Sequence, residues 1–156
     1  MPLIRAVASG DAESICRHRE GMFRAMGRDE ALIDTMAEPF RAWLDSRLAD
    51  GRYFGFVAED QGRVVGGVGL MELDWPPHPA HPTDTRRGYV FNMFVEPEFR
   101  SRGIARALML AAEEEFQRRG IAYAILHASA EGRPLYESTG WAPTAEMAKV
   151  LSASSR

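Results

Sequence analysis

A strand-like run that leads through a glycine-containing turn into a long helix is the feature that most constrains how this sequence folds. Residues 88–95 are mostly apolar, and Glu96-Pro97-Glu98 ends the run. After the turn, apolar side chains recur at the spacing of one helix face, at Ile104, Leu108, Ala111, Ala112 and Phe116. Gly120 then ends the helical pattern. The segment therefore predicts a strand, a turn and a helix N-terminus in direct succession.

Elements of both kinds are also expected before and after this segment. Helical spacing dominates near the N-terminus, whereas strand-like runs lie on either side of the polar stretch 59–63. In chain order we expect a strand at 3–7, helices at 9–26, from 29 and at 39–51, strands at 53–58 and 64–71 as a hairpin, a proline-rich loop, the strand 88–95, the helix from 104, a strand at 122–128, a short helix at 134–138 and a final strand at 147–151. This order favours a mixed α/β fold, with one sheet and helices on both of its faces, in a single domain over residues 1–156.

Composition argues against several other classes of protein. The apolar share of 46% is enough for a core, and 26% charged residues do not indicate global disorder. A net charge of −3 gives no electrostatic reason to expect a nucleic-acid partner. No apolar run reaches the roughly 20 residues of a membrane span, and the first residues lack the pattern of a signal peptide. With Cys16 as its one cysteine, the chain is expected to be a cytoplasmic protein without an internal disulfide.

The turn at residues 100–106 has the features of a phosphate-binding site. A helix N-terminus presents unpaired backbone amides and a partial positive charge, and both favour a bound anion. Gly103 has no Cβ, so phosphate oxygens could approach the backbone closely there. Arg100, Arg102 and Arg106 add positive charge around the turn. Taken alone, the same residues also fit an ordinary helix start with solvated arginines.

Two motifs in this chain resemble those of the GNAT superfamily of N-acetyltransferases. Arg100-Ser101-Arg102-Gly103-Ile104-Ala105 matches the family pattern R/Q-x-x-G-x-G/A, between the fourth strand and the following helix. Further along, the run from Tyr136 to Trp141 resembles the Y-x-x-x-G-F signature, with Trp141 in place of the usual phenylalanine. The resemblance implies a GNAT-like fold, with a central, largely antiparallel mixed sheet of six to seven strands that splays apart between strands four and five.

The resemblance also implies acetyl-CoA as the co-substrate, held in that gap. Backbone groups of the fourth strand would pair with the pantetheine arm, and backbone amides of the turn would hold the pyrophosphate. The residues thereby assigned to acetyl-CoA are Met93, Phe94, Val95, Arg100, Arg102, Gly103, Ile104, Ala105, Arg106 and Ser129. Ser129 stands where many members have an asparagine, and a serine side chain reaches less far, so this contact is expected to differ.

Tyr136 matches the tyrosine that in many family members points at the sulfur of the co-substrate. A positioned phenol can protonate the thiolate that departs when an amine attacks a thioester. Tyr136 is therefore the candidate general acid, and the alternative role is that of a core tyrosine that anchors the short helix.

The general base is less sharply indicated. Glu72 follows the apolar run of the third strand and is the candidate catalytic base, although a solvated carboxylate near a strand end fits the same position. Tyr89 occupies the place where some members have a glutamate on the fourth strand. His127, at the end of the fifth strand, is a second candidate for relaying a proton, and a water-mediated route is a third.

Together these residues predict an enzyme that moves an acetyl group from acetyl-CoA to a primary amine by direct attack in a ternary complex. A small-molecule amine and a protein amine both stay open as acceptors, and so does a homodimer. The alternative function is a non-catalytic module that binds acyl-CoA. No metal is expected, because His78 and His81 lack the carboxylate or thiol constellation of a metal site.

Overall fold

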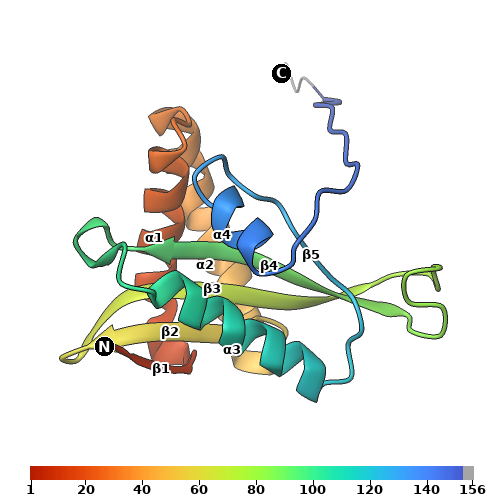
Figure 1. The fold of residues 1–156 in the computed structure, drawn as a ribbon. Coiled ribbons are helices and arrows are strands. Elements are labelled where there is room, and N and C mark those ends of the chain that lie inside the picture. Colours follow the sequence, from red (N-terminus) through yellow and green to blue (C-terminus); the bar gives the residue numbers. More distant parts are fainter. Residues whose placement is uncertain (153–156) are drawn as a thin grey trace.

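Five strands form one sheet in the computed structural model, which describes residues 1–152 (Figure 1). The strands follow one another across the sheet in chain order, antiparallel except for the parallel pair β4 and β5. They are β1 (Leu3–Ala6), β2 (Phe54–Asp60), β3 (Arg63–Asp74), β4 (Arg86–Val95) and β5 (Ala124–Leu126). The helices are α1 (Ala12–Ala25), α2 (Glu30–Asp50), α3 (Ile104–Arg118) and α4 (Arg133–Ser138), with 3₁₀ turns at Ser9–Asp11 and Pro97–Phe99.

Helices cover both faces of the sheet, as the sequence predicts. α1 and α2 lie on one face, and α3 lies along the other (Figure 1). Leu108 of α3 belongs to a buried cluster with Leu70 of β3, whereas Ile15 of α1 and Leu44 of α2 belong to a second cluster. Because helices cover both faces, residues Val64–Leu70 of β3 are all buried, which explains why that strand is continuously apolar rather than alternating.

α2 is one continuous helix, which corrects the expectation of two helices separated before Pro39. Asp29 caps its N-terminus by accepting a hydrogen bond from the Ala31 amide, and Pro39 lies inside it. A proline within a helix removes one backbone hydrogen bond. Ile33 and Leu44, on opposite sides of the proline along the chain, are both buried, so burial of one helix face outweighs that loss. In the part of the chain that the structure describes, neither α2 nor any other helix is both long and apolar enough to cross a membrane.

β4 and β5 part soon after they begin to pair, which confirms the predicted splay. β5 contacts β4 only over Gly88–Val90, so the rest of β4 has no partner strand on that side among residues 1–152. β4 also carries a bulge, because Gly67 pairs with Phe94 and Gly69 with Phe91, leaving one residue of β3 opposite two of β4. Asn92, within the bulge, has φ +54°. The second half of β4 therefore exposes backbone groups to the gap.

The sheet has five strands among the described residues, fewer than the six to seven expected. The predicted final strand at 147–151 does not form, and β5 spans three residues rather than the seven predicted at 122–128. After α4 the chain runs past β5 and away from the sheet (Figure 1). Met147 is 97% exposed and Val150 is 88% exposed. The segment 147–151 thus pairs with no strand of the sheet. An apolar pattern alone does not form a strand without a pairing partner.

Candidate active site

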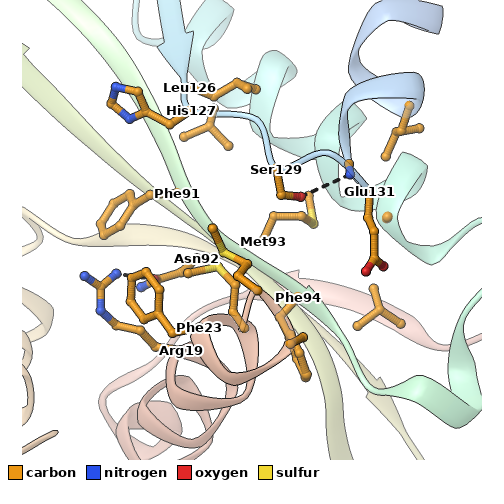
Figure 2. Close-up of a pocket in the computed structure, with 18 of the residues that line it drawn as sticks. Arg19, Phe23, Phe91, Asn92, Met93, Phe94, Leu126, His127, Ser129 and Glu131 are labelled. Atoms are coloured by element: carbon orange, nitrogen blue, oxygen red, sulfur yellow. Dashed lines mark hydrogen bonds between the residues drawn. The ribbon is translucent and has the colours of Figure 1, made fainter. Parts of the chain in front are cut away.

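A cavity of about 1270 Å³ lies where β4 and β5 part (Figure 2). Its walls come from α1, α2, the second half of β4, the N-terminal turn of α3 and the segment from β5 to α4. Most of the predicted site residues line it, namely Met93, Phe94, Val95, Arg100, Gly103, Ile104, Ala105, Arg106, Ser129 and Tyr136. The gap in the sheet and the turn at residues 100–106 are thereby parts of one cavity.

The turn before α3 presents backbone amides toward this cavity. The first hydrogen bond of the helix runs from the Ala107 amide to the Gly103 carbonyl, so the amides of Ile104, Ala105 and Arg106 have no backbone partner within residues 1–152. Gly103 has φ +83°, a left-handed conformation that glycine adopts without steric cost. A Cβ built on Gly103 would meet nothing within 4 Å. The turn is therefore open on the side from which an anion would approach.

The three arginines of the turn have different roles. Arg100 Nε donates to the Val95 carbonyl oxygen (2.7 Å), which ties the end of β4 to the turn. Arg106 Nη2 donates to Ser138 Oγ (3.1 Å) and so links α3 to α4. Arg102 Nη2 donates to the Glu98 carbonyl oxygen (2.9 Å), and its side chain lies outside the cavity wall. Arg100 and Arg106 thus line the cavity, whereas Arg102 contributes its backbone position and its charge.

Tyr136 lies on α4 at the same end of the cavity. Its side chain is buried, and its hydroxyl makes no hydrogen bond with another group of the described chain. Burial raises the pKa of the Tyr136 phenol above its ordinary value, so the phenol stays protonated at neutral pH. Ser129 Oγ accepts a hydrogen bond from the Gly132 amide (3.1 Å), as drawn in Figure 2, and so holds the entry to α4.

A chain of hydrogen-bonding side chains begins at the opposite wall. Tyr89 of β4 and His127, just after β5, both line the cavity, and the Tyr89 hydroxyl lies 2.9 Å from His127 Nδ1. His127 Nε2 donates to Glu146 Oε2 (2.6 Å). The sequence indicated Tyr89 and His127 but not Glu146, because Glu146 lies outside both motifs and reaches the site only through the path of the chain after α4.

Glu72 is the one predicted catalytic residue that does not reach the cavity. Met71, the preceding residue of β3, lines the cavity, and successive strand residues point to opposite faces. The Glu72 carboxylate accepts a hydrogen bond from Arg119 Nη1 (2.9 Å), at the end of α3, and lies 3.7 Å from Arg86 Nη1. Glu72 therefore belongs to an ion-pair cluster on the α3 side of the sheet.

The wall formed by α1, α2 and β4 contains a polar group that the sequence did not indicate. Arg19 of α1 donates to Asn92 Oδ1, and Asn92 Nδ2 donates to the Tyr53 hydroxyl (3.2 Å). Burial raises the pKa of Tyr53 to about 12, so this phenol is neutral at pH 7. Figure 2 shows the Arg19 guanidinium beside Asn92 and Phe23, away from Ser129 and Glu131. A positive charge thus lies in the cavity wall that α1, α2 and β4 form.

The histidines of the loop between β3 and β4 lie apart from this cavity. His81 is buried and accepts a hydrogen bond from Arg87 Nε (3.0 Å), and its ring stacks on that of His78. Within residues 1–152, no three histidine, cysteine, aspartate or glutamate side chains gather as a metal site. His81 is thus explained by its packing and hydrogen bonding at the hairpin tip.

Solved structures share the fold of this chain. A GCN5-related N-acetyltransferase from Ralstonia eutropha JMP134 is 52% identical, with a TM-score of 0.95 over 97% of this chain and 99% of that one. A predicted acetyltransferase with acetyl-CoA from Clostridium acetobutylicum is 26% identical, with a TM-score of 0.86 over 96% of both chains. A ribosomal-protein-alanine N-acetyltransferase from Brucella melitensis biovar Abortus 2308, 22% identical over 95% of this chain and 98% of that one, has a TM-score of 0.67 and shows likeness of fold alone.

The family comparison agrees with the geometry of the cavity. The acetyltransferase (GNAT) family model matches residues 13–141, a stretch that begins in α1 and ends just after α4. It therefore includes the splayed strands, the turn before α3 and the buried tyrosine of α4. On the sequence match, the fold and the site together, the chain belongs to the GNAT family of acetyltransferases.

Proposed function

We propose that the protein transfers an acetyl group from acetyl-CoA to a primary amine by direct attack in a ternary complex. The observation that carries this proposal is the continuity of one cavity from the open turn before α3, along the unpaired half of β4, to the buried Tyr136. The wall of one cavity thus offers a phosphate site, an extended-chain site and a proton donor, one each for the pyrophosphate, pantetheine and sulfur of a CoA thioester.

The residues at the turn fit the pyrophosphate. The amides of Ile104, Ala105 and Arg106 lack backbone partners, and the N-terminal end of the α3 dipole favours an anion. Gly103 leaves the approach open. Beyond the turn, the part of β4 after Val90 has no strand of the described chain beside it on the β5 side and can pair with the pantetheine amides as an added strand would.

The reaction forms a C–N bond and breaks a C–S bond. The unprotonated amine attacks the thioester carbonyl carbon that acetyl-CoA supplies, and CoA departs as a thiolate. Tyr136 gives its phenolic proton to that sulfur, and its raised pKa keeps this proton in place at neutral pH until the thiolate forms. The amide product and free CoA then leave the cavity.

The attacking amine must also lose a proton. His127 lines the cavity and is held by Glu146 on one side and Tyr89 on the other, which fixes its ring. We assign proton removal to His127 through the Tyr89 hydroxyl, which passes its own proton to Nδ1 as it takes one from the amine, because Nε2 already donates to Glu146 and Glu72 lies outside the cavity. The carboxylate of Glu146 then stabilises the imidazolium.

Thiol release from acetyl-CoA in the presence of a panel of primary amines tests this proposal. The expected result is amine-dependent formation of free CoA together with one acetylated amine per thiol, measured by mass spectrometry. Calorimetric titration with acetyl-CoA alone separates the alternatives. Tight binding without transfer to any amine would favour the non-catalytic module, and failure to bind acetyl-CoA would overturn both functions.

A further inference from the structure

Arg19 is a charged side chain in the cavity wall with unused hydrogen-bonding capacity. It projects from α1, and its guanidinium carbon lies 4.9 Å from the centroid of the Phe23 ring and 4.5 Å from that of Phe40. Nη1 donates to Asn92 Oδ1, whereas Nε is buried and has no partner within residues 1–152. Aromatic side chains thus hold the guanidinium in position, although only one of its three nitrogens donates to the described chain.

The charge of Arg19 is also uncompensated. Arg17 and Arg24, on the same helix, pair with Glu96 (3.2 Å) and Glu30 (2.8 Å). Arg19 forms no ion pair with a carboxylate of the described chain, and its polar neighbours are an amide and phenols. A partly buried charge without a counter-charge is costly, and proteins retain such groups chiefly where a ligand supplies the opposite charge.

The side chains near Arg19 indicate the chemical character of the rest of a bound ligand. Phe23 and Phe40 contact the guanidinium, and the cavity wall formed by α1, α2 and β4 also contains Met22, Met36, Trp43 and Phe91. Asn92, which Arg19 contacts, belongs to the bulge of β4, next to the unpaired half of that strand. A ligand at Arg19 therefore lies beside the gap in the sheet, in contact with apolar side chains.

We propose that Arg19 binds a carboxylate of the acceptor, so that the acceptor is a small amino acid-like compound with an apolar side chain. This rests on the proposed function, because the same molecule must present its amine to the thioester. A guanidinium pairs with a carboxylate through two parallel hydrogen bonds, which would fix the orientation of the amine a few bonds away. The aromatic and methionine side chains of the wall would then contact the apolar side chain.

Matched acceptors test this inference. Phenylalanine, methionine and leucine are each compared with the corresponding amino acid amide, which keeps the amine and side chain but lacks the negative charge. We expect kcat/KM for each acid to exceed that for its amide by about tenfold to a hundredfold, the range of a charged hydrogen bond. The amine of the amide is the less basic one, so a lower rate with the amide cannot come from scarcity of unprotonated amine.

Variants locate the effect at Arg19. Arg19→Gln should lower kcat/KM for the acids by about the same factor more than it lowers kcat/KM for the amides, whereas Arg19→Lys should retain part of the preference. Arg24→Gln is the matched control, because Arg24 lies on the same helix, outside the cavity, and pairs with Glu30. A purely structural role, in which Arg19 only supports the bulge through Asn92, would lower the rates of acids and amides alike.

The outcomes separate this inference from the proposed function. Equal rates for acids and amides in the wild-type protein, or Arg19→Gln affecting both equally, would overturn the carboxylate site while transfer stands. Binding of N-acetylphenylalanine to the protein–CoA complex, measured by calorimetry against N-acetylphenylalanine amide, provides a readout without turnover. A preference for the acid that Arg19→Gln abolishes supports the site even where transfer is slow, and no preference overturns it.

Discussion

The two ends of the cavity present different groups to a ligand, backbone groups at one end and side chains at the other. At the α3 end, the groups aimed at the ligand are backbone amides and an unpaired strand edge, and the side chains mainly hold that backbone in place. At the α1–α2 end, the ligand would meet side chains alone, with Arg19 among aromatic rings. A fold that fixes backbone positions can be shared across a family, whereas side chains set by three separate elements can change from one member to another.

This difference gives the two ends different sensitivities. A substitution at the α3 end should lower the rate of transfer to every acceptor, because it affects the thioester or its binding. A substitution at the α1–α2 end should discriminate among acceptors, as Arg19→Gln is expected to do. Substitutions of Tyr136 and His127 should also affect the reaction with every acceptor, since these residues handle protons for whichever acceptor is bound.

The largest expected effect is that of Tyr136→Phe. Loss of the proton donor should lower kcat by about 10²–10⁴-fold for all acceptors, with acetyl-CoA affinity nearly unchanged. Phenylalanine keeps the ring that packs at the base of the cavity. Steady-state kinetics and calorimetric titration measure the two quantities separately, and Tyr123→Phe, which removes a phenol outside the cavity, is the control. A variant with wild-type turnover would assign Tyr136 to packing.

His127→Asn should have the next largest effect. We expect a fall in kcat/KM of about 10²-fold near pH 7, the lower end of general-base contributions, because water can take over part of the role. The deficit should shrink as pH rises, since more of the amine is then already unprotonated. Glu146→Gln should reproduce a smaller part of the same change, because it keeps the hydrogen-bonding position but loses the charge. A deficit that stays constant with pH would contradict proton removal by His127.

Gly103→Val tests the backbone end directly. Valine at φ +83° is strained, and its side chain would project into the space from which the pyrophosphate approaches. We expect at least about a tenfold loss of acetyl-CoA affinity, or about 1.4 kcal/mol. Gly51→Val is the matched control, because Gly51 has φ +82° and open space at the end of α2, away from the cavity. If both variants fold and bind acetyl-CoA equally well, the pyrophosphate does not bind at this turn.

The α3 end of the cavity could be predicted from the sequence to a greater extent than the α1–α2 end. The turn at Gly103 and the position of Tyr136 are local, so short motifs were enough to indicate them. The contact between Arg19 and Asn92 joins residues 73 positions apart, and nothing local to either residue signals it. Glu72 and Met71 differ by one position in β3, yet only Met71 lines the cavity. The sequence did not show which of the two would do so, because an unbroken apolar run does not reveal the face to which each residue of a doubly covered strand points.

A buried polar pair outside the cavity lining joins α1 to the end of β4. His18 of α1 donates through Nε2 to Glu96 Oε2 (3.1 Å), just after β4, and its ring lies 5.1 Å from that of Phe94. Burial lowers the pKa of His18 below its ordinary value, against the opposing effect of Glu96. Burial alone would raise the pKa of Glu96, but hydrogen bonds from His18 and Arg17 outweigh it, so that pKa is lowered.

The smallest expected effect is therefore on stability rather than catalysis. Because the native pKa of His18 is depressed, the unfolded chain binds the proton more readily, and stability is full above about pH 6.5 and falls as pH drops through that value. The contribution of Glu96 is lost only at lower pH, below the ordinary carboxyl pKa of about 4.5. Between pH 7.5 and 5.5 the free energy of unfolding from urea titration should fall, by at most about 1.4 kcal/mol per pH unit from this residue. His18→Gln should flatten that slope whatever its effect on stability at pH 7.5, and an unchanged slope would show that His18 titrates alike in both states.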